Sequence, residues 1–252
     1  MKNQFRLMAF LSVLLLTTMA CSITRRTPTP TPQTIEKDQT MLVSEIRQLG
    51  VFTKIEMDGG ATVILVQGNE HSIKVEGTQR IVDQLRTEVK DGVLVIDYRD
   101  RKLFELWAEN PTLTITFKDL SDFRLDGGVE LKADDLNLEK INFTINGGAS
   151  VRLNNLVVNT LNMSLAGGGD IHVSGVAENL TIDVSGGTNF EAGDLKCANV
   201  SVKIAGAGNV EVWAMDKLNL DLAGAYSVSY WGSPEITQSI AGIGQVKALG
   251  EK

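Results

Sequence analysis

Three charged residues at the spacing of a sequence repeat are the first candidates for chemistry. Asp183, Lys203 and Asp221 occupy equivalent places in successive repeats. In stacked strands Asp183 and Asp221 would lie two strands apart, about 9–10 Å. That distance approaches the carboxylate separation of an inverting glycoside hydrolase. Because Lys203 lies between the two carboxylates, the column is more typical of a ladder of paired charges. We therefore expect no catalytic residue, with a polysaccharide hydrolase or lyase as the enzyme alternative.

The sequence Gly167-Gly-Gly-Asp170 superficially matches a calcium-binding repeat, which needs several charged oxygens close together. Only two residues are acidic in the column three places after the glycine that opens each cluster: Glu130, Ser150, Asp170, Asn189, Asn209, Ser227 and Gln245. His71 and His172, the only histidines, are expected on exposed strand positions without metal-binding partners. No helix is expected after the glycine clusters to bind a phosphate. We expect neither a metal nor a cofactor.

A short, regular repeat organises the positions that could carry these side chains. The glycines that open the clusters are Gly127, Gly147, Gly167, Gly186, Gly206, Gly224 and Gly242. Their nearly constant spacing predicts a solenoid. Glycine accepts a positive φ, so each cluster is expected to turn a corner of the chain.

Apolar residues alternate with polar ones before each glycine, which predicts strands with one buried face. The column two places before the glycine is Leu125, Ile145, Leu165, Val184, Ile204, Leu222 and Ile240. A further apolar anchor is expected to close each coil at Leu156, Val176, Leu195 and Met215. We predict an all-β fold, a single-stranded right-handed parallel β-helix with coils of about 18–20 residues.

Residues 1–20 carry Lys2 and Arg6 before a short apolar run, which predicts a signal peptide. Thr18-Met19-Ala20-Cys21 resembles a bacterial lipoprotein box, although Thr18 and Met19 depart from the usual residues and ordinary secretion remains an alternative. Cys21 is the expected lipidation site. Residues 21–40 contain alternating threonines and prolines and predict an extended tether.

Residues 41–120 are expected to hold the first rung and an atypical N-terminal capping block, continuous with the repeat β-helix of 121–252. The segment Phe52-Thr-Lys-Ile55-Glu-Met57-Asp-Gly59 matches the repeat pattern, with Gly59 in the place that Gly127 takes in the next repeat. Asp91-Gly92 between two alternating runs predicts a β-hairpin. Terminal repeats usually depart from the consensus because an open sheet end recruits other chains.

The chain has 252 residues and a formal net charge of −7. It lacks the clustered basic residues that nucleic-acid binding requires, so no nucleic-acid partner is expected. Cys197 has no cysteine or histidine pattern around it and is expected to be a small apolar residue near a turn.

Side chains between the apolar positions form an outward face, which is the candidate surface for a ligand. Its members are Thr181, Asp183, Ser201, Lys203, Asn219 and Asp221, with Trp231 at a turn as a side chain that could stack on a sugar. A flat face of hydroxyls and amides can form hydrogen bonds with glycans or with another envelope protein.

In the repeated pattern, two apolar residues that alternate with other residues are followed by Gly and then by Gly or Ala. This pattern resembles the bacterial family "putative auto-transporter adhesin, head GIN domain". The segments Val89–Ile96 and Tyr230-Trp-Gly-Ser-Pro234 support the resemblance. It implies a cell-surface or secreted β-solenoid, often a lipoprotein, whose molecular function is unknown. No functional residues come with it.

We therefore expect an extracytoplasmic binding, adhesion or scaffolding module, held on a membrane or cell surface by a lipid at Cys21, or otherwise secreted. Its expected partners are the membrane and a glycan or another envelope protein. A purely structural envelope component is a further alternative. The oligomeric state is left open.

Overall fold

The computed structural model describes residues 40–99 and 110–252. The predicted signal segment, Cys21 and the tether up to residue 39 lie outside these residues. The fold is all-β, as expected. Its strands in the first half are β1 Leu42–Gln48, β2 Lys54–Asp58, β3 Ala61–Gln67, β4 Ser72–Thr78, β5 Leu85–Lys90, β6 Val93–Tyr98 and β7 Thr112–Phe117. One short helix, α1 Gln79–Gln84, lies between β4 and β5, and three long strands follow: β8 Asp122–Asp134, β9 Asn137–Trp231 and β10 Glu235–Gly250.

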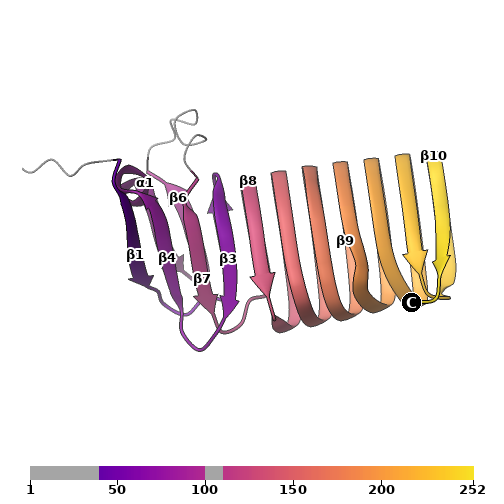
Figure 1. Cartoon of the computed structure of the whole chain (residues 1–252), viewed down its shortest axis with the longest axis horizontal. Helices are drawn as coiled ribbons and strands as arrows, with labels where there is room; N and C mark the ends of the chain where they lie inside the picture. Colours follow the sequence, from indigo (N-terminus) through magenta and orange to yellow (C-terminus); the bar gives the residue numbers. More distant parts are fainter. Residues whose placement is uncertain (1–39, 100–109) are drawn as a thin grey trace, which may run out of the picture. The chain divides into compact units, whose positions relative to one another are not determined.

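The repeats pair in parallel and in register. β8 pairs with the start of β9, which is the next repeat, so that Phe123 lies opposite Phe143 and Leu125 opposite Ile145. β10 pairs with the end of β9 in the same way, which places Ile236 opposite Leu218. Successive turns of β9 lie side by side between β8 and β10 (Figure 1).

β2 and β3, on either side of Gly59, are joined to the repeats through β8. Both strands pair in parallel with β8 in the register that the sequence pattern predicts, with Met57 opposite Leu125 and Val63 opposite Leu131. β8 continues through the glycine corner, so its first half pairs with β2 and its second half with β3.

The strands before the repeats change direction. β7 pairs in parallel with β3, but β4 pairs antiparallel with β7, and β1 antiparallel with β4. On the other side of the corner, β6 pairs in parallel with β2, and β5 antiparallel with β6. The β5–β6 turn is the predicted Asp91-Gly92 hairpin, with φ of 50° and 77°.

Alternation places one side of nearly every strand in a single core. The largest side chains that are fully buried are Phe52, Phe117, Phe123, Phe143 and Phe190. Two of the expected anchors, Val176 and Met215, are instead 53% and 38% exposed. Leu156 and Leu195 are buried as expected, as is Cys197, whose thiol is free.

His71 differs from its prediction as an exposed strand residue. It precedes β4, is half-buried, and packs edge-on against Phe52 with ring centroids 4.9 Å apart. Its Nδ1 is buried without a hydrogen-bond partner among the residues described. Within residues 40–99 and 110–252, no helix has the length and apolarity to cross a bilayer.

Candidate functional site

Six of the predicted ligand-face residues lie on the outer side of β9. Thr181, Lys203, Asn219 and Asp221 are exposed, and Asp183 and Ser201 are half-buried. The Lys203 Nζ lies 3.9 Å from the Asp183 Oδ2. The charge column therefore contains the ion pair that a charge ladder predicts.

Part of this face is hollowed. Ser201, Asn219 and Asp221 line a space of about 330 Å³ together with Thr237 and Ser239 of β10. Hydroxyl, amide and carboxylate groups from three successive repeats meet there. Thr181, Asp183 and Lys203 lie outside its lining.

Trp231 does not join the other six residues. It is half-buried at the end of β9, where its Nε1 donates a hydrogen bond to the Glu211 Oε1 at 2.8 Å. The Lys252 Nζ lies 5.5 Å from the centre of its ring. Because this ammonium group occupies one face of the indole, a sugar could stack on that face only by displacing Lys252.

The first glycine of each corner is required by the backbone. All seven have φ between 117° and 158°, a region that residues with a side chain rarely adopt. Each lies against the glycine of the previous coil. A Cβ built on Gly147 would be 2.1 Å from the Gly127 carbonyl oxygen, and one on Gly186 would be 2.0 Å from that of Gly167.

The second corner position has no such requirement. Gly148 and Gly187 have no positive φ, and a Cβ built on either meets nothing within 4 Å. The fold therefore does not explain why these residues lack a side chain. Their effect is to leave the backbone bare on the outside of the corner.

A groove of about 560 Å³ runs along these bare corners, from the coil that contains Gly169 to β10. One side of the groove is lined by exposed second corner positions, of which three have little or no side chain and the last is larger: Gly187, Ala207, Ala225 and Ile243. Its polar rim is the column three places after the first glycine: Asp170, Asn189, Asn209 and Ser227. The sequence alone suggested only structural roles for the corners and for this polar column.

Two buried side chains, Thr188 and Tyr226, lie between the second corner positions and the polar rim. Thr188 is only 6% exposed, and its Oγ1 has no hydrogen-bond partner among the described residues. Tyr226 is 9% exposed and lines the same groove. A buried hydroxyl without a partner is unfavourable, and the Thr188 Oγ1 is itself covered, so a ligand could reach it only if neighbouring atoms moved.

The groove offers hydrogen bonding along a line. An asparagine side chain presents two N–H donors and a carbonyl acceptor, and a hydroxyl can donate and accept. Adjacent coils are separated by about 4.8 Å, so similar polar groups recur at that interval. An extended polymer with hydroxyl groups could contact several coils at once.

The two large pKa shifts belong to buried side chains away from both hollows. Burial raises the pKa of the Cys197 thiol and that of the Tyr98 hydroxyl to about 12. The Tyr98 hydroxyl also donates a hydrogen bond to the Gly60 carbonyl at 2.7 Å. Across the described ranges, no group of three or more His, Cys, Asp or Glu residues is placed to hold a metal ion.

Comparisons with known proteins found one matching family and several structures with a similar fold. The model of the family described as "Putative auto-transporter adhesin, head GIN domain" matches residues 51–234. A crystal structure of a "putative adhesin" from Bacteroides fragilis is 25% identical, with a TM-score of 0.71, and the match covers 83% of this chain and 97% of that one. No curated protein matches the chain.

Two structures from Parabacteroides distasonis share the fold at lower identity. One is described as a "putative lipid binding protein", with 19% identity, a TM-score of 0.60 and coverage of 82% of this chain and 96% of that one. The other is a "putative adhesin" with 21% identity, a TM-score of 0.59 and coverage of 83% and 97%.

Proposed function

The chain belongs to the family described as "Putative auto-transporter adhesin, head GIN domain", and from this we propose that it is a non-catalytic binding module of the cell surface. Its ligand is a neutral, hydroxyl-rich polymer, most simply a glycan chain. The polymer lies in the groove along the glycine corners. The observation that carries the proposal is the row of small residues at the second corner positions Gly187, Ala207 and Ala225, which keeps the groove open beside its polar rim although a Cβ on Gly187 would meet nothing within 4 Å.

Charge supports a neutral ligand. The whole chain has a formal net charge of −7, and the groove rim carries Asp170 but no basic residue. An anionic polymer would be repelled by this rim. Hydroxyl groups, in contrast, can pair with the Asn209 amide and with the Asn189 amide, of which one N–H already donates to the Glu191 carboxylate at 3.0 Å.

The repeat geometry supports the finer interpretation of the fold as a parallel β-helix. In-register pairing of equivalent positions in successive repeats and the stacked corner glycines are what such a helix requires. We also propose that a lipid on Cys21 and the Thr/Pro-rich tether of residues 21–40 attach it to the membrane, as the sequence predicts. The family description supports a location at the cell surface.

A glycan array with the full-length protein, followed by titration of the best neutral glycan, tests the binding proposal. Gly187→Leu should weaken binding at least about tenfold, because it adds a large side chain to the lining of the groove. Gly148→Leu is the matched control. It makes the same change at the same corner position, where a Cβ also meets nothing within 4 Å, but outside the groove lining.

A double variant distinguishes the groove from the predicted polar face. Asn219→Ala with Asp221→Ala removes two side chains from the smaller hollow and should leave glycan binding unchanged. Loss of binding in this variant, with normal binding by Gly187→Leu, would move the site to the polar face. Failure to bind any neutral glycan would favour a structural role. Cleavage of a polysaccharide that Asp183→Asn abolishes would establish the enzyme alternative.

The membrane anchor is tested separately. Cys21→Ala should release the protein from membranes washed with carbonate, whereas Cys197→Ala should not, because Cys197 is a buried side chain of the core. Continued retention of the Cys21→Ala protein would contradict lipid attachment at this residue.

A further inference from the structure

The last strand, β10, has one partner where the strands before it in the repeats have two. It pairs with residues 217–231 of β9 on one side and with no other described strand. Its 16 residues are exposed except for Val246 and Leu249, which are half-buried. Every second backbone N–H and C=O of this strand therefore faces away from the sheet without a strand partner.

Apolar side chains are exposed along the same strand. Ile236, Ile240 and Ile243 are 39%, 43% and 85% exposed, whereas Leu218 and Leu222 of the preceding coil are fully buried. Exposed edges are usually protected by prolines, charges or bulges. β10 has no proline, its charged residues are Glu235 and Lys247, and its register shifts only at Ala248/Gly250.

We propose that the open edge of β10 binds the β10 edge of a second copy of this chain, antiparallel and related by a two-fold axis. A two-fold contact requires a strand that is complementary to itself. With Ala241 opposite its own copy, Glu235 lies opposite Lys247 and Ile236 opposite Val246, each pair occurring twice. The same register therefore places opposite charges together and Ile236 beside Val246, whereas Ile240 lies opposite Gly242 and Ile243 opposite Ser239.

The bend of the strand is compatible with this symmetry. The corner glycine, Gly242, lies near the middle of β10 and beside Ala241. A two-fold axis near the corner places the half before the bend of one copy against the half after the bend of the other. Small side chains at the axis let the two backbones approach to pairing distance.

The N-terminal end of a second copy also presents an edge strand, β1, with Leu42 and Ile46 80% and 65% exposed, but a β10–β1 contact would be head-to-tail and would not close into a dimer. The terminal strands there, β1 and β5, pair antiparallel with their neighbours, and Arg47 joins them across the end of the sheet. A β10 contact leaves the two β1 strands at opposite ends of the joined sheet. Copies anchored on two different surfaces could then meet, and this consequence, unlike the dimer, rests on the proposed surface anchoring.

Charge reversal tests the register. Sedimentation of the full-length Cys21→Ala protein, which avoids lipid effects, should show a monomer–dimer equilibrium. Lys247→Glu or Glu235→Lys places like charges opposite each other at two points and should raise the dimer Kd about tenfold or more. The double variant restores both pairs and should recover dimerisation. Both residues are exposed, so these changes should leave the fold intact.

A cross-link tests the axis. In the Cys21→Ala background, Ala241→Cys should give a disulfide-linked dimer on mild oxidation, since directly opposed residues of antiparallel strands lie within disulfide reach. Ala223→Cys, the exposed equivalent one coil earlier, should not. A strictly monomeric protein, a dimer insensitive to both charge reversals, or open-ended oligomers without the Ala241→Cys cross-link would each overturn the proposal. None of these results would depend on whether the groove binds a glycan.

Discussion

The two ends of the repeat sheet differ in how they terminate. At the N-terminal end, the sheet changes from parallel to antiparallel pairing on both sides of the corner, through β4 and β1 on one side and β5 on the other. The helix α1 contacts β1, β4 and β5, and it buries Ile81 and Val82. The strands at this end do not follow the repeat, although β1 and β5 each still have a single strand partner among the described residues.

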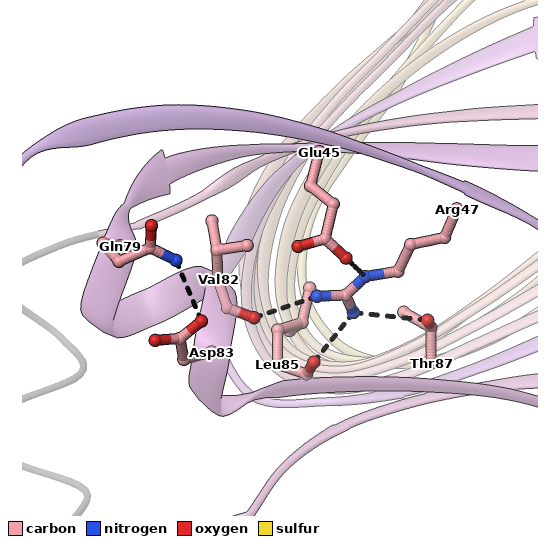
Figure 2. A network of polar contacts seen from close by, with 7 residues as sticks. All are labelled: Glu45, Arg47, Gln79, Val82, Asp83, Leu85 and Thr87. Atoms are coloured by element: carbon pink, nitrogen blue, oxygen red, sulfur yellow. Dashed lines mark hydrogen bonds and ion pairs between the residues drawn. The ribbon is translucent and has the colours of Figure 1, made fainter. Parts of the chain in front are cut away.

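Arg47 connects the elements at this end. It extends from β1, and its guanidinium donates hydrogen bonds to the carbonyls of Val82 and Leu85 and to the Thr87 hydroxyl (Figure 2). Its Nε donates to the Glu45 carboxylate at 2.7 Å. One side chain thus joins both edge strands to the end of the helix.

The C-terminal end follows the repeat to its last strand and has no comparable change of pairing among the described residues. β10 keeps the register and the corner glycine of the inner coils, and its inward residues remain partly exposed. Lys252 contacts the Gly193 carbonyl and the Asp194 carboxylate and lies near two tryptophan rings, but this contact holds the chain end and leaves the edge of β10 unpaired. The repeat pattern therefore forms strands that pair with one another, but it does not supply a partner for the last strand of the sheet.

The largest expected difference between an inner coil and the C-terminal end concerns the corner glycines. Gly147→Ala forces a Cβ to within 2.1 Å of the Gly127 carbonyl oxygen at a φ of 132°, and should cost about 3 kcal/mol or more of unfolding free energy. Gly242→Ala meets the Gly224 carbonyl at the same distance. In Gly242→Ala the contact can be relieved by releasing β10 alone, so we expect a smaller loss of unfolding free energy than in Gly147→Ala. Urea unfolding measures this loss, and faster amide exchange should be confined to β10.

Gly148→Ala is the control for this prediction, because its Cβ meets nothing within 4 Å. We expect a change within about 0.5 kcal/mol. Equal losses in Gly147→Ala and Gly242→Ala, with exchange increased throughout the sheet, would show that β10 is as tightly coupled to the core as the inner coils are.

Sequence patterns predicted the features that recur from repeat to repeat. They missed the features that depend on distant residues or on a neighbouring strand, such as the exposure of β10, the Arg47 contacts and the groove. The corner glycines, the inward columns and the Asp91-Gly92 hairpin follow from local patterns. Ile240 has the same pattern as Leu222, yet one is 43% exposed and the other buried, because burial depends on a following coil that no local pattern reveals. The Arg47 contacts span 35 to 40 residues, and the groove depends on side chains that are missing from the corner.

Truncation of inward side chains should show the next largest difference. Leu222→Ala removes a fully buried side chain and should cost about 2–5 kcal/mol, whereas Ile240→Ala in the last coil should cost about 1 kcal/mol or less. Both variants are compared by urea unfolding in the Lys247→Glu background, so that dimerisation does not cover Ile240. Similar losses would mean that another part of the chain covers β10 in solution.

Replacing Arg47 should lower the unfolding free energy by less than the truncation of a fully buried side chain such as Leu222. Arg47→Met leaves the Val82 and Leu85 carbonyls without this donor and should destabilise the protein by about 2 kcal/mol. Hydrogen exchange should increase first in β1 and α1. Lys252→Met, the comparison at the other end, removes a more exposed ion pair and should cost about 0.5 kcal/mol. Arg47→Lys should recover only part of the loss, because an ammonium group lacks the planar fork of donors.

The smallest expected difference is in the response to acid. The hydrogen bond from the Asn146 amide to the Asp126 carboxylate, 2.5 Å long, lowers the pKa of Asp126, and Arg124 lowers it further. Because this pKa is lower in the folded protein than in the unfolded chain, the carboxylate stabilises the fold at pH values above its unfolded pKa of about 3.9. That contribution is lost as the pH falls through the lower folded value.

Asp126→Asn should therefore be less stable than the original protein at pH 6 and nearly equal to it at pH 2, as judged by urea midpoints. The effect should be small, since the Asp126 side chain is 43% exposed and solvent screens its charge. The equivalent column near the C-terminal end consists of Ala205, Ala223 and Ala241, which cannot titrate. Ala223→Asp, which has no Asn146 equivalent to stabilise the charge, should not gain stability between pH 2 and pH 6. If it gained as much as Asp126 provides, the hydrogen bond from Asn146 would not be the cause of the lowered pKa.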